Sequence, residues 1–310
     1  MNTEPRYRPF DARVTAVRRL SPSFVRITFG GNALTNFASD GLDQRIKVLL
    51  PNAQGGIPAF AAGPDDWRAQ WAALPDDLRP PMRSYTIREL RHDRHGNNEV
   101  DVDFMLHGDS GPASRWAARA TAGEHIVLIG PNAKYPRQRG GIGWVPPHGA
   151  RRFLIAGDET ALPAVARILA SLPADAEVRA FIEVPVADDS LALPATERRR
   201  VTWLPRGGGA PGELLVDAVR RALPAPRDGD GAGVDPVEVD VDSVVLWEVP
   251  NSDPVTGVPV AEPAFSDNYV WLAGEAGAIK QLRRHLVRDV GLERASVAFM
   301  GYWRLGKAQA

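Results

Sequence analysis

The hydrophobic pattern of the chain changes near its middle, and this change restricts the fold more than any other feature. In the first half, segments such as residues 99–107 alternate apolar and polar side chains. In the second half, apolar runs such as residues 152–156 are continuous, and segments with helical spacing separate them. Alternation is typical of antiparallel strands with one buried face, whereas continuous runs between helices indicate a parallel sheet covered on both faces. We therefore predict two domains of different architecture.

The expected domain boundary lies in a stretch rich in Pro, Gly and His around residues 147–151. We predict an antiparallel β-barrel over residues 1–148 and a parallel-sheet α/β domain over residues 149–310. A chain of 310 residues is long enough for each domain to bury its own core. Residues 225–242 hold six acids and one arginine among glycines and prolines, so we expect a mobile loop there. An acidic docking arm is the alternative interpretation.

The composition argues against several classes of protein. The chain has no cysteine, which excludes disulfides, thiol nucleophiles and zinc–thiolate sites. Its net charge of −1 gives no reason to expect a nucleic-acid partner. No apolar stretch is long enough to span a membrane, and the first ten residues lack the apolar segment of a secretory signal. We expect a cytoplasmic monomer with no membrane partner.

Two segments of the first half carry the residue types that hold a flat, anionic ligand. Residues 83–88 read Arg-Ser-Tyr-Thr-Ile-Arg, which offers a guanidinium for phosphate, a ring for stacking and hydroxyls for hydrogen bonds. Residues 111–114 read Gly-Pro-Ala-Ser, which indicates the start of a helix whose free N–H groups bind an anion. Each segment alone is equally compatible with a charged edge strand or an ordinary capped helix. Together they predict a site for a phosphate-containing ligand.

Two turns of the second half directly follow apolar strands. Residues 157–160 read Gly-Asp-Glu-Thr, and residues 274–275 read Gly-Glu. Open α/β sheets bind ligands beyond the carboxyl ends of their strands, so these turns predict a nucleotide site. A plain helix cap is the alternative for the first turn.

Taken together, these segments resemble the siderophore-interacting protein family, which are FAD-dependent ferric-siderophore reductases of the ferredoxin-reductase superfamily. The resemblance runs from about residue 8 to residue 307. It rests on residues 83–88, 103–108, 111–117, 157–163, 271–275 and 301–306. Residues 225–242 and 254–263 lengthen the second domain beyond the compact pattern of the family, which leaves the geometry near Trp247 open.

The resemblance implies a role in cofactor binding for each matching position. The FAD phosphates would contact Arg83, and the isoalloxazine and ribityl would contact Tyr85 and Thr86, with Ser84 in the same segment. The cofactor would run beside the strand that carries Asp103 and His107. Its pyrophosphate would be capped by Gly111, Pro112, Ala113 and Ser114. The crevice where nicotinamide meets flavin would be lined by Thr160, Ala161, Gly274 and Glu275. The residues packing near the flavin, or gating its face, would be Tyr302 and Trp303.

The resemblance further implies an enzyme that takes hydride from NADPH or NADH and passes single electrons to chelated Fe(III), releasing Fe(II) for iron assimilation. We expect no catalytic side chain and no metal site in the protein itself. Cations are expected to bind an anionic ferric siderophore, and the candidates are Lys47, Lys134 and Arg304. Glu183 favours NADH if it faces the ribose, whereas Arg206 favours NADPH, and we favour NADPH. The alternatives are a flavin reductase with a different acceptor and a non-catalytic siderophore-binding module.

Overall fold

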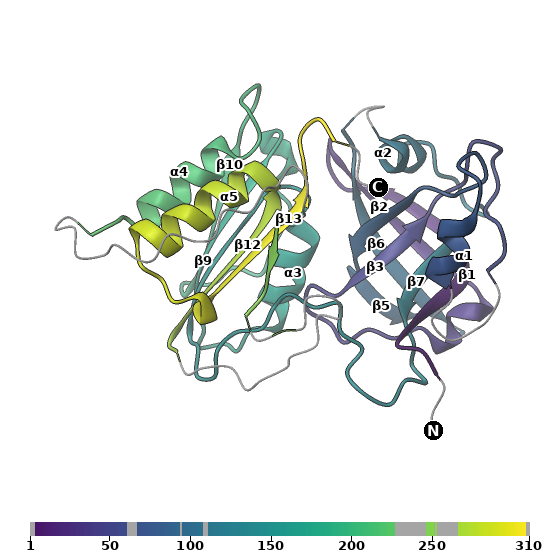
Figure 1. Cartoon of the computed structure of the whole chain (residues 1–310), viewed down its shortest axis with the longest axis horizontal. Coiled ribbons are helices and arrows are strands. Elements are labelled where there is room, and N and C mark those ends of the chain that lie inside the picture. The colour runs from purple at the N-terminus through teal and green to yellow at the C-terminus, as the bar shows by residue number, and fades with distance from the viewer. Residues whose placement is uncertain are drawn as a thin grey trace. The chain divides into compact units, whose positions relative to one another are not determined.

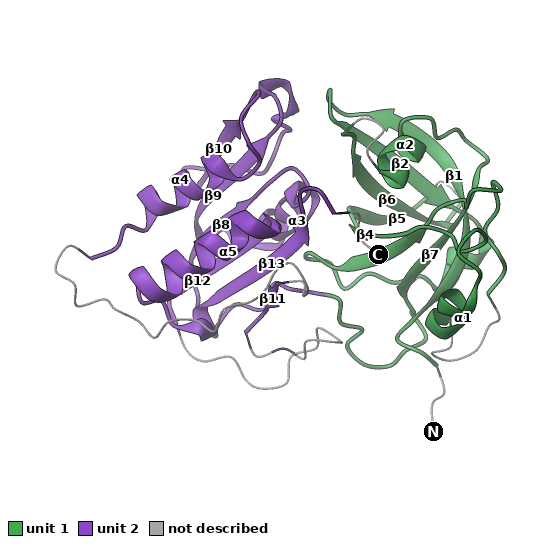
Figure 2. Cartoon of the chain, turned by 45° about the horizontal axis from the view of Figure 1, so that its top comes forward, with its two compact units in different colours: residues 1–141, 310 green, residues 142–309 purple. Residues whose placement is uncertain are grey.

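The computed structural model describes residues 4–60, 67–93, 95–107, 111–226, 246–250, 252 and 266–307. The chain forms two compact units, residues Met1–Gly141 with Ala310, and Ile142–Gln309 (Figure 2). Most of residues 225–242, for which we predict a mobile loop, lie outside the described residues.

The first unit is built on one antiparallel sheet with the strand order β4-β3-β7-β1-β2-β6-β5. Its strands are β1 (Tyr7–Arg19), β2 (Phe24–Gly30), β3 (Arg45–Leu49), β4 (Met82–Thr86), β5 (Glu89–His92), β6 (Asn98–Met105) and β7 (His125–Pro131). The two outermost strands, β4 and β5, are consecutive parts of one segment. Between them, the amide of Ile87 donates to Gln44 O and that of Arg88 donates to Asp101 O. The segment therefore joins both edges of the sheet and closes it as a barrel.

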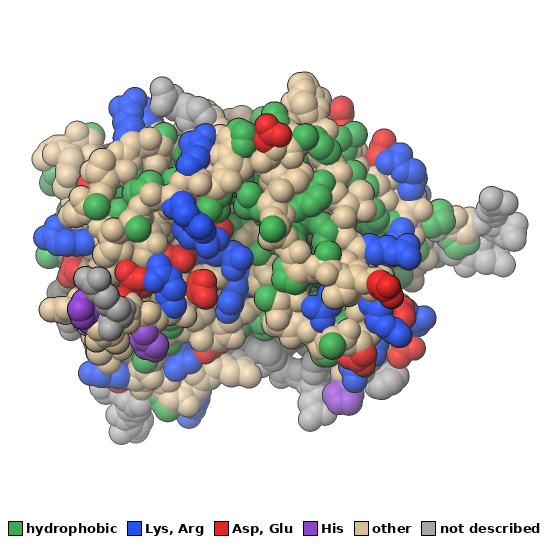
Figure 3. Space-filling model, turned by 180° about the vertical axis from the view of Figure 1, so that it is seen from behind, with side chains coloured by type: hydrophobic (Ala, Val, Ile, Leu, Met, Phe, Trp, Pro, Cys, Tyr) green, Lys and Arg blue, Asp and Glu red, His purple; other side chains and the backbone are tan. Residues whose placement is uncertain are grey.

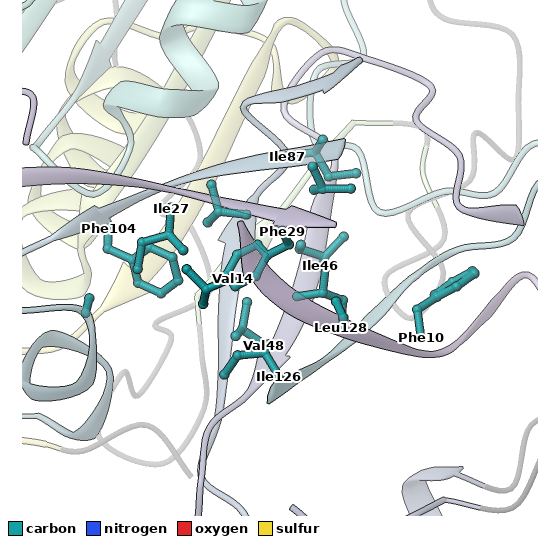
Figure 4. Packing of buried hydrophobic residues seen from close by; sticks show 14 of the residues in the cluster. Phe10, Val14, Ile27, Phe29, Ile46, Val48, Ile87, Phe104, Ile126 and Leu128 are labelled. Carbon is teal, nitrogen blue, oxygen red and sulfur yellow. The ribbon is translucent and has the colours of Figure 1, made fainter. Parts of the chain in front are cut away.

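The alternation of the strands fills this barrel with apolar side chains. Phe29, Ile46, Phe104 and Leu128 come from four different strands and point toward one another (Figure 4). Each is at most 1% exposed. Short helices lie at the periphery of the barrel, namely η1 (Asn32–Asn36), α1 (Trp67–Ala73) and α2 (Pro112–Ala117). Helix α1 covers a second apolar cluster around Leu49 with the side chains of Trp67 and Trp71.

The second unit holds a sheet with the strand order β10-β9-β8-β12-β13-β11. Its strands are β8 (Arg152–Gly157), β9 (Glu177–Val184), β10 (Arg199–Pro205), β11 (Trp247–Glu248), β12 (Asn268–Glu275) and β13 (Val297–Trp303). The pairs from β10 to β13 are parallel, as predicted. Strand β11 pairs with β13 in the antiparallel direction, so the sheet is mixed at that edge.

Helices cover both faces of this sheet (Figure 1). Helices α4 (Glu213–Ala222) and α5 (Ala276–Arg284) pack on one face, and α3 (Leu162–Ser171) lies on the other. A π-helical turn, η3 (His285–Asp289), extends α5, and short 3₁₀ turns η2 (Ala187–Asp189) and η4 (Arg294–Ser296) complete the unit. The described helices include none that is long and apolar enough to cross a membrane.

The order of the strands fixes where this unit can bind a ligand. From β8, the chain builds outward through β9 to β10, and it then returns to place β12 on the other side of β8. The winding direction therefore reverses between β8 and β12. In open α/β sheets a crevice forms at such a reversal, beyond the carboxyl ends of the strands.

Candidate functional site

Strand β4 presents the predicted cofactor residues on two different faces. Its register places Ser84 opposite Lys47 and Tyr85 opposite the buried Ile46. Because side chains alternate along a strand, Arg83 and Tyr85 share one face, and Ser84 and Thr86 share the other. The ring of Tyr85 packs 4.3 Å from that of Phe104, measured between centroids. Arg83 and Tyr85 can therefore contact one ligand from the same face of the sheet. The side chain of Thr86 lies on the opposite face and does not belong to that surface.

Lys47 and Arg83 are half-buried cations that have no carboxylate partner among the described residues. The Lys47 ammonium donates to Ser84 Oγ at 2.5 Å, and the Arg83 guanidinium donates to the carbonyl of Met82 at 2.9 Å. Burial, reinforced by repulsion from Arg45, Arg68 and Arg83, lowers the pKa of Lys47 to about 8. Burial also lowers the pKa of Arg83. Desolvated cations without acids are the groups that an anionic ligand would stabilise.

Other arginines of the barrel show the contrasting arrangement. Asp103, predicted to lie beside the cofactor, is buried and accepts from Arg26 at 2.6 and 2.8 Å. Arg88 lies 3.6 Å from the same carboxylate. The side chain of Asp103 is therefore engaged within the barrel wall, and Arg88 acquires a structural role that the sequence did not assign.

The Gly-Pro-Ala-Ser segment begins helix α2 as predicted. Gly111 is the N-cap and Pro112 occupies the first turn. The hydroxyl of Ser114 is buried and accepts the backbone N–H of His107 at 3.0 Å, which ties the end of β6 to the helix. Residues 108–110, between these two points, lie outside the described residues. The anion site at Gly111, Pro112, Ala113 and Ser114 remains a prediction.

The carboxyl edge of the second sheet is organised around Asp158, which is 0% exposed. One of its oxygens accepts from Thr160 N at 2.9 Å and from Thr160 Oγ1 at 2.5 Å. The other accepts from Glu275 N at 2.8 Å and from Trp303 Nε1 at 2.6 Å. Asp158 therefore joins Thr160 and Glu275, which were predicted to line one crevice, to Trp303, which was predicted to pack near the flavin. Ala161 is fully buried and is the N-cap of α3.

This arrangement requires glycine at position 274. The residue has a φ of +156°, and a Cβ there would lie 2.7 Å from the carboxylate of Asp158. Such a contact is too short, so any side chain at position 274 would displace Asp158 or the end of β12. Gly274 thus contributes to this edge by the space it leaves rather than by a contact.

Glu159 and Arg206 form a second connection at the same edge. Their side chains make two hydrogen bonds of 2.6 Å each, and both are largely buried. Arg206 also lies 3.5 Å from Glu183. Glu183 is 0% exposed and accepts the N–H groups of Gly212 and Leu215 at the start of α4. The condition under which Glu183 would favour NADH is therefore not met, because its carboxylate faces the helix, and Arg206 is engaged by two acids.

The remaining predicted residues of the second unit also have local partners. The Glu275 carboxylate caps α5 through Ala278 N at 2.9 Å. Tyr302 stacks on Trp247 with centroids 5.8 Å apart and an interplanar angle of 3°. Arg304 forms a backbone bridge with Lys307 just after β13. Tyr302 therefore packs within its own unit, while a role for Arg304 toward a ligand remains a prediction.

The three predicted substrate cations have different settings. Lys47 is half-buried on β3, Lys134 is exposed beyond the end of β7, and Arg304 belongs to the other unit. In the face shown in Figure 3, Lys and Arg side chains alternate with Asp and Glu rather than forming a surface of one sign. No group of three or more His, Asp or Glu side chains with the arrangement of a metal site occurs among the described residues.

Comparison with known protein families gives two matches, one for each half of the chain. Residues 13–135 match the siderophore-interacting FAD-binding domain. Residues 150–306 match the model described as siderophore-interacting protein. The first match covers β4 and the start of α2, and the second covers the Asp158 edge.

Similar individual proteins point in the same direction. A siderophore utilization protein from T. fusca has 30% identity and a TM-score of 0.68, over 98% of this chain and 96% of that one. The ferric vibriobactin reductase of Vibrio cholerae is 30% identical over 68% of this chain and 71% of its own length. The NADPH-dependent ferric-chelate reductase of Escherichia coli is 31% identical over 74% of this chain and 85% of its own length.

Proposed function

Because this chain belongs to the siderophore-interacting protein family, we propose that it is an FAD-dependent ferric-siderophore reductase with NADPH as the preferred electron donor. The observation that carries this proposal is the pair of half-buried cations Lys47 and Arg83 on the barrel sheet, which have no carboxylate partner in the part of the chain that the structure describes. It is supported by the relatives named as ferric reductases, of which one is named as NADPH-dependent.

The first unit fits FAD through the chemistry of β4. Arg83 supplies a forked donor for the phosphates, and Tyr85, on the same face, supplies a ring beside Phe104. Lys47 lies on the other face of the sheet, which suits its assignment to a separate anionic ligand, the ferric chelate. When bound, FAD accepts electrons in a pair and releases them singly, which is what a one-electron acceptor requires.

The second unit supplies the site for the nicotinamide donor. Thr160, Gly274 and Glu275 lie at the reversal of winding between β8 and β12, where ligands bind in folds of this class. The donor loses a hydride, which carries two electrons, and two Fe(III) centres each gain one. The products are the oxidised nicotinamide, a proton and two Fe(II) ions, which hard oxygen ligands hold more weakly than Fe(III).

The test of this proposal is turnover with a trap for ferrous iron. We expect the purified protein to retain FAD and, under nitrogen, to oxidise more than one equivalent of NADPH only when a ferric siderophore is present. An Fe(II)-specific chelator should then collect two iron ions for each NADPH consumed. Consumption of NADPH by oxygen alone would favour a flavin reductase with a different acceptor, and siderophore binding without turnover would favour a binding module.

The lowered pKa of Lys47 leads us to expect that the protein binds anionic ferric chelates less tightly at alkaline pH. Its pKa of about 8 means that the ammonium loses its proton as the pH rises through that value, whereas an ordinary lysine stays charged. The dissociation constant of an anionic ferric siderophore should therefore increase between pH 7 and pH 9. Flavin fluorescence titrations at several pH values measure it. In Lys47→Met this dependence should disappear, and a wild-type dependence that persists in the variant would contradict the assignment.

A further prediction separates anionic from neutral substrates. The double variant Lys47→Ala, Arg304→Ala should lose about 10-fold in kcat/KM for an anionic ferric catecholate, because two favourable charges are removed. A neutral ferric hydroxamate should lose less than about 3-fold by the same reasoning. Arg18→Ala, at an exposed cation on β1 that is assigned to no site, provides the control in the same assay. Equal losses for both chelates would remove the role of these cations in substrate binding.

A further inference from the structure

The carboxylate of Asp158 connects three segments that come together at the carboxyl edge of the second sheet. These are the turn before α3 through Thr160, the end of β12 through the amide of Glu275, and the end of β13 through the indole of Trp303. The four donors divide evenly between its two oxygens. The first two of these segments, at Thr160 and Glu275, line the proposed nicotinamide site. One buried acid therefore controls the geometry of that edge.

The number of donors matches the ionised form of the carboxylate only. An ionised carboxylate has about four lone-pair positions and no proton of its own. A protonated carboxyl group becomes a donor at one oxygen, so that oxygen can no longer accept from both of its neighbours. Protonation of Asp158 must therefore weaken a bond to Thr160, Glu275 or Trp303.

The surroundings of Asp158 bring this protonation toward neutral pH. Burial, followed by the neighbouring Glu159, raises the pKa of Asp158 to about 7, although the bonds from Thr160 and Trp303 oppose the increase. The other charged groups at this edge are Arg206, Glu183 and Glu275. Arg206 is held by Glu159 and Glu183, and Glu275 caps α5, so none of them forms an ion pair with Asp158.

We propose that Asp158 is a positioning residue for the nicotinamide donor, which in its ionised form fixes Thr160, the Glu275 amide and the Trp303 indole in one arrangement that protonation loosens. The proposal rests on the proposed function, because it assigns the donor to this edge. It adds a specific source of pH dependence to the transfer of hydride from the donor.

The indole of Trp303 reports directly on the state of Asp158. In protein labelled with ¹⁵N at tryptophan, the Nε1–H resonance absent from Trp303→Phe is that of Trp303. We expect this resonance to shift with pH, with a midpoint near neutrality, and to stop shifting in Asp158→Asn. The exposed acid Asp175 gives the control variant, Asp175→Asn, in which the titration should be unchanged. This measurement needs no turnover and no nicotinamide.

Kinetics then test whether the titration matters for the donor. The rate of FAD reduction by NADPH, measured anaerobically by stopped flow, should rise with pH through the same midpoint. Asp158→Asn should be about 10- to 100-fold slower at pH 8 and independent of pH, because its amide cannot accept from all the donors. Thr160→Val removes one bond to the ionised form, so its midpoint should move upward by about 0.5 to 1 pH unit.

The outcomes separate this inference from the proposed function. A Trp303 resonance that does not titrate, or that titrates equally in Asp158→Asn, would overturn the inference. The inference would also be overturned if the midpoint of the pH titration in Thr160→Val were the same as in the wild type. This variant tests the inference even if Asp158→Asn does not fold. If the wild-type protein binds FAD but is not reduced by NADPH or NADH, the proposed function is overturned instead. The Trp303 resonance would still show whether protonation of Asp158 changes its bond to the indole.

Discussion

Replacement of Arg83 by alanine should remove FAD from the purified protein. A guanidinium that pairs with a phosphate contributes about 1.5–3 kcal/mol through charge-assisted hydrogen bonds, which corresponds to roughly 10- to 150-fold in the dissociation constant. The variant should lose affinity for FAD without losing stability. Among the described residues Arg83 makes no ion pair, and its guanidinium donates only to the adjacent carbonyl of Met82. Equilibrium dialysis with FAD, followed by absorption spectroscopy, measures the change.

Two variants serve as controls for this result. Arg83→Lys keeps the charge but loses the forked geometry, so its affinity for FAD should be intermediate. Arg18 lies exposed on β1 of the same sheet, and Arg18→Ala should bind FAD like the wild type. If Arg83→Ala retains full FAD occupancy, the assignment of this arginine to the phosphates is wrong.

Replacement of Arg206 by alanine should destabilise the second unit rather than change its choice of nucleotide. The guanidinium is bound by Glu159 and lies close to Glu183, and all three side chains are largely buried. Removing one partner of a buried pair leaves an uncompensated charge and costs about 3–5 kcal/mol. Urea unfolding followed by far-ultraviolet circular dichroism should show this loss, while FAD in the other unit should be released at the wild-type urea concentration.

The comparison of nucleotides decides between the two roles of Arg206. Arg200 lies exposed on β10, the strand that ends just before Arg206, and Arg200→Ala should have wild-type stability. The double variant Glu159→Leu, Arg206→Leu should recover much of the lost stability, because an apolar pair can replace a buried ion pair. A stable Arg206→Ala protein with a selective loss of NADPH over NADH would show that Arg206 binds the 2′-phosphate instead.

The sequence was sufficient to predict the two architectures and the approximate position of most elements, and its motifs resemble those of the family. Periodicity carries the information on architecture, because the alternation of residues 99–107 suits an antiparallel sheet with one buried face and the continuous apolar run at residues 152–156 suits a parallel sheet covered on both faces. The antiparallel pairing of β11 was not predictable in this way. It involves only Trp247 and Glu248, a segment too short to have a pattern, and depends on its contact with β13.

The candidate sites were predictable at the level of segments but not of side-chain partners. Thr160 and Glu275 were predicted to line one crevice and Trp303 to pack near the flavin, but their common partner Asp158 follows only from the sheet order. Glu183 and Arg206 were considered for the nucleotide because Glu183 ends one expected strand and Arg206 follows the next. The burial of Glu183 depends on its contact with the start of α4, and its pairing with Arg206 depends on the neighbouring ends of β9 and β10. The sequence alone gives none of these contacts in space.

An anaerobic titration of the FAD-loaded protein tests the central claim most directly. One equivalent of NADPH, or of NADH with lower affinity, should bleach the visible absorption of the flavin. Addition of two equivalents of a ferric siderophore should then restore it and deliver two equivalents of Fe(II) to a trapping chelator. If neither nucleotide bleaches the flavin, or if the reduced protein is not reoxidised by any ferric siderophore, the assignment as a ferric-siderophore reductase is wrong.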